Sequence, residues 1–379
     1  MPADTDRQFG ATITRLTRRQ DLSRDEAVRA FTTILNDDTT AMQQGAFLAA
    51  LATKGETEAE IAGAWDAIYQ LDTVKPGFIP DRPLVENSGT GMDTFKTFNI
   101  STAAAVVAAA GGVAMARHGA RSITSACGAV DMAEALGVDV ECPVEMVVAS
   151  VKTAGIGLFN GMSPTVHPRA LGRILSQINF GSTLNIAASL ANPVLPAIGL
   201  RGVYSREMIM PAIRVMRAIG YEQAIVLHGL VDEGGHSGAG MDEASICGPT
   251  YCARLDESGR IETFTLHPED YGLGGYNPGE LAPADDLPSE ARRFVSLLAA
   301  RDRSAGRAAI LLNTALIFYA ARTVSTITAG VAAAAAILES GRAIETLTAW
   351  VSAQNRDPAR GLRQLQQWLD TALIAPEVS

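Results

Sequence analysis

The stretch "NSGTGMDTFKTFNIST", residues 87–102, places bare backbone, hydroxyl groups and a carboxylate directly ahead of the Ala-rich run 103–110. Backbone N–H groups and the dipole at the start of a helix favour a bound anion. Helix capping would account for one serine here, but not for the whole set. The residues that offer these groups are Gly89, Thr90, Gly91 and Asp93 in the turn, then Asn99, Ser101 and Thr102 at the predicted helix start. This stretch predicts a phosphate-binding loop between a strand and a helix.

Composition narrows the class of protein. The 379 residues are 47% hydrophobic, which is enough for one large or two modest domains. A formal net charge of -10 argues against binding to duplex nucleic acid. The four cysteines form no CxxC pair, which is typical of inert thiols in a reducing compartment. The first twenty residues carry no apolar signal core, and the longest apolar runs are shorter than a bilayer span. We expect a cytoplasmic, soluble protein.

The pattern of elements changes once along the chain. Residues 8–72 show only helical periodicity, and Ser23 with Glu26 predicts a capping box at one helix start. A Pro-rich linker at 74–83 follows. Beyond it, strand and helix patterns alternate, which indicates a mostly parallel sheet covered by helices. The fold class is therefore α/β with a small all-helical domain, and ligands should gather at the carboxyl ends of the strands.

A second polar cluster is "ARHGARSITSACG", residues 116–128. Arg117 and His118 precede Gly119 at a predicted strand end, and Ser125 lies in the hydroxyl-rich segment that follows. Cations, hydroxyl groups and glycine in such a turn predict a second anion site. A solvated basic loop is the alternative. His118 could act as a base or could have a hydrogen-bonded structural role.

A third cluster, "GAGMDEASICGPT" at 238–250, contains the adjacent carboxylates Asp242 and Glu243. Like charges side by side repel, and a divalent cation such as Mg²⁺ would offset that repulsion. A solvated acidic turn is the other interpretation. Two anion sites with an acidic metal site indicate a substrate that carries a phosphate at one end and a metal-bound pyrophosphate at the other.

Several long motifs occur in the order found in one family. "GTGMDTFKTFNIST", "RHGARSITSACGAVDMAEALG", "VLHG" and "GMDEASICGPT" resemble the signatures of the anthranilate phosphoribosyltransferase family, and the resemblance covers nearly the whole chain. It implies a helical domain at 1–75, joined by residues from about 165–190, and an α/β domain at 76–379 that binds phosphoribosyl pyrophosphate. It also implies a homodimer.

The resemblance further implies an Mg²⁺-dependent pentosyltransferase that moves 5-phosphoribosyl from phosphoribosyl pyrophosphate to an aromatic amine. His118 and Arg117 would be catalytic, and Ser101, Asp242 and Glu243 would hold the metal. The donor would contact Gly89, Thr90, Gly91, Asp93, Asn99, Ser101, Thr102, Gly119 and Ser125. The acceptor would contact Ala120, His167, Arg173 and Gln177.

The chain departs from the family pattern at four positions. Met92 stands where the family has glycine, and Arg117 where it has lysine. Ala120 replaces an asparagine, and Gln177 replaces the arginine that meets the acceptor carboxylate. Arg173 or Arg169, nearby in the same predicted helix, could substitute. We therefore expect an acceptor other than anthranilate, or anthranilate held through altered contacts. A nucleoside phosphorylase-like enzyme and a non-catalytic nucleotide-binding relative are the alternatives.

Overall fold

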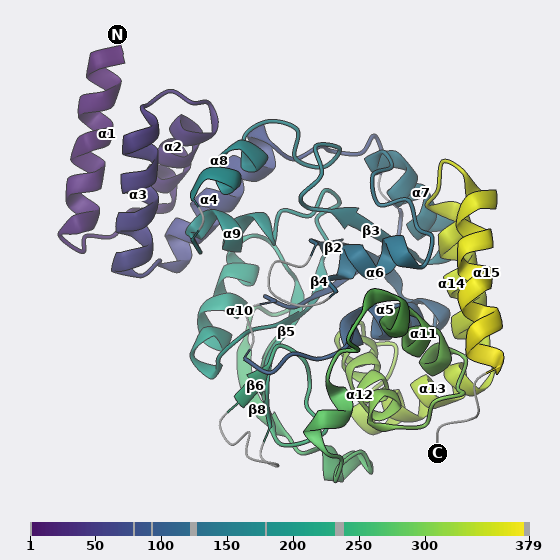
Figure 1. Ribbon diagram of the computed structural model, residues 1–379. Coiled ribbons are helices and arrows are strands. Elements are labelled where there is room, and N and C mark those ends of the chain that lie inside the picture. Colours follow the sequence, from purple (N-terminus) through teal and green to yellow (C-terminus); the bar gives the residue numbers. More distant parts are fainter. Residues whose placement is uncertain are drawn as a thin grey trace.

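The computed structural model describes residues 2–78, 80–91, 94–121, 127–178, 180–231 and 239–374. Figure 1 shows a group of helices from the N-terminal part of the chain set beside a larger body with a central sheet. The predicted α/β class, with its helical N-terminal part, is confirmed.

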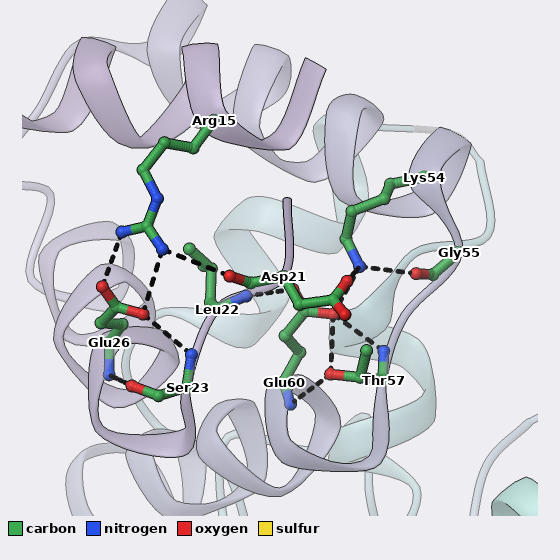
Figure 2. Close-up of polar contacts among 9 residues, drawn as sticks. All are labelled: Arg15, Asp21, Leu22, Ser23, Glu26, Lys54, Gly55, Thr57 and Glu60. Atoms are coloured by element: carbon green, nitrogen blue, oxygen red, sulfur yellow. Dashed lines mark hydrogen bonds and ion pairs between the residues drawn. The ribbon is translucent and has the colours of Figure 1, made fainter. Parts of the chain in front are cut away.

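The N-terminal helices are α1 (Pro2–Thr17), α2 (Arg24–Leu35), α3 (Ala41–Lys54) and α4 (Glu58–Leu71). Three of them begin at a hydroxyl side chain that accepts a backbone N–H, as expected of good N-caps. The capping box predicted from Ser23 and Glu26 is confirmed at the start of α2, and Thr57 with Glu60 forms another at α4. Figure 2 shows both boxes, joined by polar contacts from the loop before α2 to Glu60 of α4 and Lys54 of α3.

The described strands form one sheet in the order β3-β2-β1-β4-β5-β7-β8, with β6 paired to β5. Strands β1 to β5 are parallel, whereas β6, β7 and β8 pair in antiparallel fashion. Their bounds are β1 (Leu84–Ser88), β2 (Ala114–Gly119), β3 (Ile156–Asn160), β4 (Ile198–Gly202), β5 (Gln223–Val231), β6 (Ala239–Met241), β7 (Thr250–Leu255) and β8 (Ile261–Leu266). The expected mostly parallel sheet is present, and its parallel carboxyl ends bring several loops to one edge.

Helices cover both faces of the sheet. One face, with Val85, Leu200 and Leu227, shares a core with the Ala-rich helix α5 (Ile100–Ala110) and with α12 (Ala305–Ala320). On the other face, Ala224 and Val226 belong to a core that includes the N-terminal helices. The remaining helices are α6 (Ala129–Ala135), α7 (Val144–Ala154), α8 (Leu171–Ile178), α9 (Thr183–Ala188), α10 (Ile209–Ala218), α11 (Leu287–Leu298), α13 (Ile327–Glu339), α14 (Arg342–Ala353) and α15 (Pro358–Ile374), with 3₁₀ turns at Arg206–Met208, Pro268–Tyr271 and Pro278–Leu281.

The second core explains how the helical part is attached. Apolar residues of α8 and α9 pack in the same cluster as those of α2, α3 and α4, and α10 closes the cluster against the sheet. Buried apolar surface therefore runs from the N-terminal helices to the sheet without interruption. The domain bounds of 1–75 with about 165–190, and 76–379, stay a prediction.

Among the described helices, none is by itself long and apolar enough to cross a membrane. Of these helices, α13 and α14 have sufficient length and apolar character only when they are taken together across their 73° bend.

Candidate functional site

The glycine-rich turn follows β1 at the carboxyl edge of the sheet. Gly91 has a φ of +67°, a conformation that glycine adopts without strain. Its backbone N–H donates to Oδ2 of Asp242 at 2.7 Å, and the Thr90 hydroxyl donates to the same oxygen at 3.4 Å. A Cβ on Gly89 would lie 2.4 Å from that oxygen, so only glycine allows the approach. The donors of the turn thus converge on an anionic group, which in this structure is a carboxylate.

The two adjacent carboxylates reach different parts of this edge. Asp242 contacts the glycine-rich turn, whereas Oε1 of Glu243 accepts the backbone N–H of Ser101 at 3.1 Å. Ser101 lies in the first turn of α5, where the helix dipole favours negative charge. The separate N–H partners offset the repulsion expected between neighbouring carboxylates. The glycine-rich turn, the start of α5 and the acidic pair therefore meet at one place.

Arg117 of β2 connects the start of α5 to the sheet. Its side chain is 2% exposed, and it donates to Asn87 Oδ1 at 2.9 Å, to Thr102 Oγ1 at 2.8 Å and to Ser101 Oγ at 3.2 Å. Burial lowers the pKa of Arg117 to about 10, against the opposing attraction of Glu243 and Glu86, so the side chain stays cationic at neutral pH. A fixed positive charge therefore lies directly under the N-terminus of α5.

His118 is the next residue of β2, and its side chain lies on the other face of the sheet because side chains alternate along a strand. Its ring centroid is 5.5 Å from that of His167, and its Nδ1 is 3.5 Å from the Ser189 carbonyl oxygen. Burial, reinforced by His167, lowers the pKa of His118 to about 3, and burial also lowers the pKa of His167. Both rings are therefore neutral at pH 7.

The Nε2 atoms of His118 and His167 are buried and have no hydrogen-bond partner among the described residues. Nδ1 of His167 lies 2.9 Å from the Asp72 carbonyl oxygen, a contact that requires its proton on Nδ1 and leaves Nε2 as an acceptor. Unsatisfied buried nitrogens are uncommon in folded proteins. The two rings thus offer acceptor positions suited to a ligand that carries N–H groups.

Asp72 positions His167 from the end of α4. Its carboxylate accepts the backbone N–H groups of Arg169, Ala170 and Leu171 at 2.6, 2.9 and 2.7 Å. These donors belong to the first turn of α8 and the residues ahead of it, where N–H groups lack partners within the helix. Asp72 therefore fixes the start of α8 through its carboxylate, and the histidine before that helix through its backbone carbonyl.

The other residues predicted for the acceptor lie apart from the two histidines. Arg173 donates to Asp37 at 3.1 Å, to Gln44 at 3.4 Å and to the Ile34 carbonyl at 3.1 Å, so it faces α2 and α3. Gln177, one turn later in α8, is exposed, and so is Ala120. The structure thus brings His167 to His118 but does not bring Arg173 there.

Three further predictions concern the donor loops. Asn99 donates from Nδ2 to the Cys127 carbonyl at 3.2 Å, which joins the start of α5 to the segment before α6. Gly119 ends β2, and its carbonyl accepts the Gly161 N–H at 2.8 Å. Asp93, Ser125 and the divergent Met92 lie outside the described residues. The roles of all these residues stay predictions.

Two family models match the chain. The model described as "Glycosyl transferase family, helical bundle domain" covers residues 11–71, and "Glycosyl transferase family, a/b domain" covers residues 81–344. Fold and site together thus define a glycosyl transferase with a helical bundle and an α/β domain.

Named relatives narrow this class. Anthranilate phosphoribosyltransferase from Desulfosudis oleivorans is 34% identical over 89% of this chain and 96% of its own length. The enzyme of that name from Anaeromyxobacter dehalogenans (strain 2CP-C) is 35% identical over 90% and 97%. The chain belongs to the anthranilate phosphoribosyltransferase family.

Solved structures agree on the fold. Anthranilate phosphoribosyltransferase from Thermus thermophilus superposes with a TM-score of 0.78 at 27% identity, over 90% of this chain and 98% of that one. The Saccharomyces cerevisiae enzyme, solved in complex with phosphoribosyl pyrophosphate and Mg, gives a TM-score of 0.76 at 22% identity, over 90% and 98%.

Proposed function

We propose that this chain transfers the 5-phosphoribosyl group of phosphoribosyl pyrophosphate to the amine of anthranilate. Its relatives at 34–35% identity, which match nearly all of the chain, are named for phosphoribosyl transfer to anthranilate. Of our two expectations for the acceptor, these relatives support anthranilate held through altered contacts. The observation that carries the proposal is the meeting of the glycine-rich turn, the start of α5 and the acidic pair, beside two neutral buried histidines.

The donor would bind at the turn and at α5. Gly89, Thr90 and Gly91 would contact the pyrophosphate. The N–H of Gly91 can donate to the pyrophosphate only after its hydrogen bond to Asp242 breaks. Ser101 and Thr102 would add hydroxyl groups, and Arg117 beneath them supplies a fixed positive charge. Because Asp242 occupies the position that suits an anion, donor binding and movement of this carboxylate are coupled.

Magnesium fits the side chains present. Asp242, Glu243 and the hydroxyl of Ser101 supply oxygen ligands, the type that Mg²⁺ takes together with substrate phosphates. The ion, when bound, would neutralise charge on the departing pyrophosphate.

On the other face, the acceptor amine would lie against the two histidines. As the bond from ribose carbon to amine nitrogen forms and the bond to pyrophosphate oxygen breaks, the nitrogen loses one proton. The departing pyrophosphate can take that proton, whereas Nε2 of His118, which is neutral, has a pKa lowered to about 3 and is unpartnered among the described residues, can accept a hydrogen bond from the amine. Nε2 of His167 can accept the amine's second N–H and hold the nitrogen in line.

The test measures loss of anthranilate fluorescence in the presence of phosphoribosyl pyrophosphate and Mg²⁺, with donor binding followed by calorimetry. Asp242→Asn should lower turnover by at least about 100-fold and weaken the heat of donor binding. Asp285→Asn, an exposed Asp-to-Asn change, is the matched control and should behave as wild type.

Wild-type protein that binds the donor without consuming anthranilate would exclude this function. Phosphate-dependent cleavage of a nucleoside would instead identify a phosphorylase, and no heat of donor binding would identify a non-catalytic relative. The homodimer and the cytoplasmic location stay predictions, and sedimentation equilibrium checks the first.

A further inference from the structure

A second buried guanidinium lies at the carboxyl edge of the sheet. Arg201 of β4 is 5% exposed, and it donates to Ser88 Oγ at 3.1 Å and to Ser189 Oγ at 2.5 Å. Both partners are neutral hydroxyl groups, and among the described residues no carboxylate forms an ion pair with Arg201. Burying a cation without an anionic partner is costly, so such a group is usually kept for a ligand or a counterion.

The acidic group nearest in the sheet does not supply this counterion. Glu86 of β1 accepts the Tyr221 hydroxyl at 2.7 Å, and burial raises the pKa of Glu86 to about 7. A large fraction of this carboxyl is therefore protonated at neutral pH. Glu86 and Asp242 attract Arg201 only through space, while burial lowers the pKa of Arg201.

Arg201 lies on the face of the sheet that holds the two histidines. It is directly opposite Ser88 in the register between β1 and β4. Its hydroxyl partner, Ser189, also presents its carbonyl oxygen 3.5 Å from Nδ1 of His118. The guanidinium and the imidazole therefore share one neighbour, whereas Arg117 contacts the start of α5 on the opposite face.

Helix α8, which was expected to supply a cation for the acceptor carboxylate, supplies none beside the two histidines. Arg173 is held by Asp37, Gln44 and the Ile34 carbonyl of the N-terminal helical part, and Gln177 carries no charge. An acceptor that carries a carboxylate beside its amine would thus meet only one buried cation on the histidine face, Arg201, within the described part of the chain.

We infer that Arg201 binds the carboxylate of the acceptor and thereby selects an aromatic amine with an adjacent acid group. This inference rests on the proposed function. The carboxylate would displace the hydroxyl groups of Ser88 and Ser189 from the two terminal nitrogens, because a planar guanidinium pairs better with a carboxylate than with neutral oxygens. The substrate would supply the counterion that this buried arginine lacks.

The test compares kcat/KM for anthranilate with that for anthranilamide, its uncharged analogue, in each variant. Wild type should prefer anthranilate, and Arg201→Gln should reduce that preference by about 10- to 100-fold, mainly through KM for anthranilate. Arg201→Lys keeps the charge and should retain part of the preference. The heat of binding of phosphoribosyl pyrophosphate should stay as in wild type, which also shows that the variant is folded.

Arg173→Gln serves as the comparison for the helix position, and it should leave the preference between the two amines unchanged. The inference is overturned if Arg173→Gln abolishes that preference or if Arg201→Gln preserves it. Equal loss of both substrates in Arg201→Gln, or loss of donor binding in both Arg201 variants, would assign Arg201 to support of the fold or the donor and would overturn it as well. Absence of transfer by wild type would instead reject the proposed function itself.

Discussion

Arg117 and His118 are neighbours in β2, yet their side chains serve opposite faces of the sheet. Arg117 donates to Ser101 and Thr102 of α5, whereas His118 lies beside His167 and the Ser189 carbonyl. A strand turns successive side chains to opposite sides, so this dipeptide links two separate subsites at one sheet edge. Under the proposed function the donor subsite and the acceptor subsite lie on these two faces, so each can be perturbed independently.

The first prediction uses this division. Arg117→Met should raise KM for phosphoribosyl pyrophosphate by about tenfold or more, because Asn87 and Thr102 lose a charged donor and α5 loses its fixed cation. KM for anthranilate should change little. His118→Ala should show the reverse pattern, with kcat and the anthranilate KM affected most. Steady-state kinetics with each substrate varied in turn measures both; equal shifts of both KM values in both variants would contradict the division.

The second prediction concerns Asp72, which does not face the donor. Asp72→Ala should raise KM for anthranilate, because three N–H groups at and just before the start of α8 lose their acceptor, and the segment that carries His167 is then no longer fixed to the end of α4. Unfolding free energy should fall by about 2 kcal/mol or more. Asp38→Ala, at an exposed position, is the control. An unchanged anthranilate KM in a destabilised Asp72→Ala protein would show that the carboxylate only caps the helix.

The third prediction concerns the pH dependence of stability. Because burial raises the pKa of Glu86 to about 7 from an ordinary 4.5, the native protein keeps a proton that the unfolded chain releases between those values. The contribution of Glu86 to stability therefore falls as pH rises from about 4.5 to 7, and levels off above it. Glu86→Gln cannot titrate, so its unfolding free energy should rise relative to wild type over this range by a few kcal/mol.

Denaturant unfolding of wild type and Glu86→Gln at several pH values measures that difference. His118, whose pKa is lowered to about 3, destabilises both proteins equally as pH falls below 6.5, so it cancels in the comparison. A difference that stays constant from pH 4.5 to 8 would show that folding does not raise the pKa of Glu86.

Local sequence was sufficient for the features that depend on neighbours in the chain. The glycine-rich turn, the hydroxyl groups at the start of α5 and the capping box at Ser23 are each formed within a few residues, and the structure contains all three. Glycine and capping residues carry such information because they fix backbone geometry directly. The sequence assigned the turn and Asp242 to one metal-bound pyrophosphate, but it did not predict the direct contact between Gly91 and that carboxylate, which lie 151 residues apart.

The roles that the sequence did not predict depend on partners far away in the chain. Asp72 acts on a residue 97 positions later, and Arg201 on one 113 positions earlier, so no local pattern pairs them. The only signal for Arg201 was a charged residue within the apolar strand "AIGLRGV". Arg173 was expected near the acceptor because of its place in α8, but Asp37, 136 residues earlier, holds its guanidinium against α2.

The last prediction concerns the helical part, where Glu60 is fully buried (Figure 2). Its carboxylate accepts the backbone N–H groups of Leu22 and Thr57, each at 2.8 Å, and the ammonium of Lys54 at 2.9 Å. Burial lowers the pKa of Lys54, but hydrogen bonds to Asp21 and Glu60 outweigh it, so the pKa is raised overall. One carboxylate therefore accepts hydrogen bonds from the backbone of two loops and from one nearly buried ammonium.

Glu60→Ala should cost about 3–5 kcal/mol of unfolding free energy, because two backbone N–H groups lose their acceptor and the nearly buried ammonium of Lys54 keeps only Asp21 and the Gly55 carbonyl. Glu58→Ala, two residues earlier on α4, breaks only a contact with Arg214 whose side chains are 40% and 46% exposed, and should cost under about 1 kcal/mol. Lys54→Met combined with Glu60→Gln should be less destabilised than the single changes added together. Urea unfolding measures all five variants; a Glu60→Ala protein as stable as Glu58→Ala would mean that water reaches Lys54 and replaces the carboxylate.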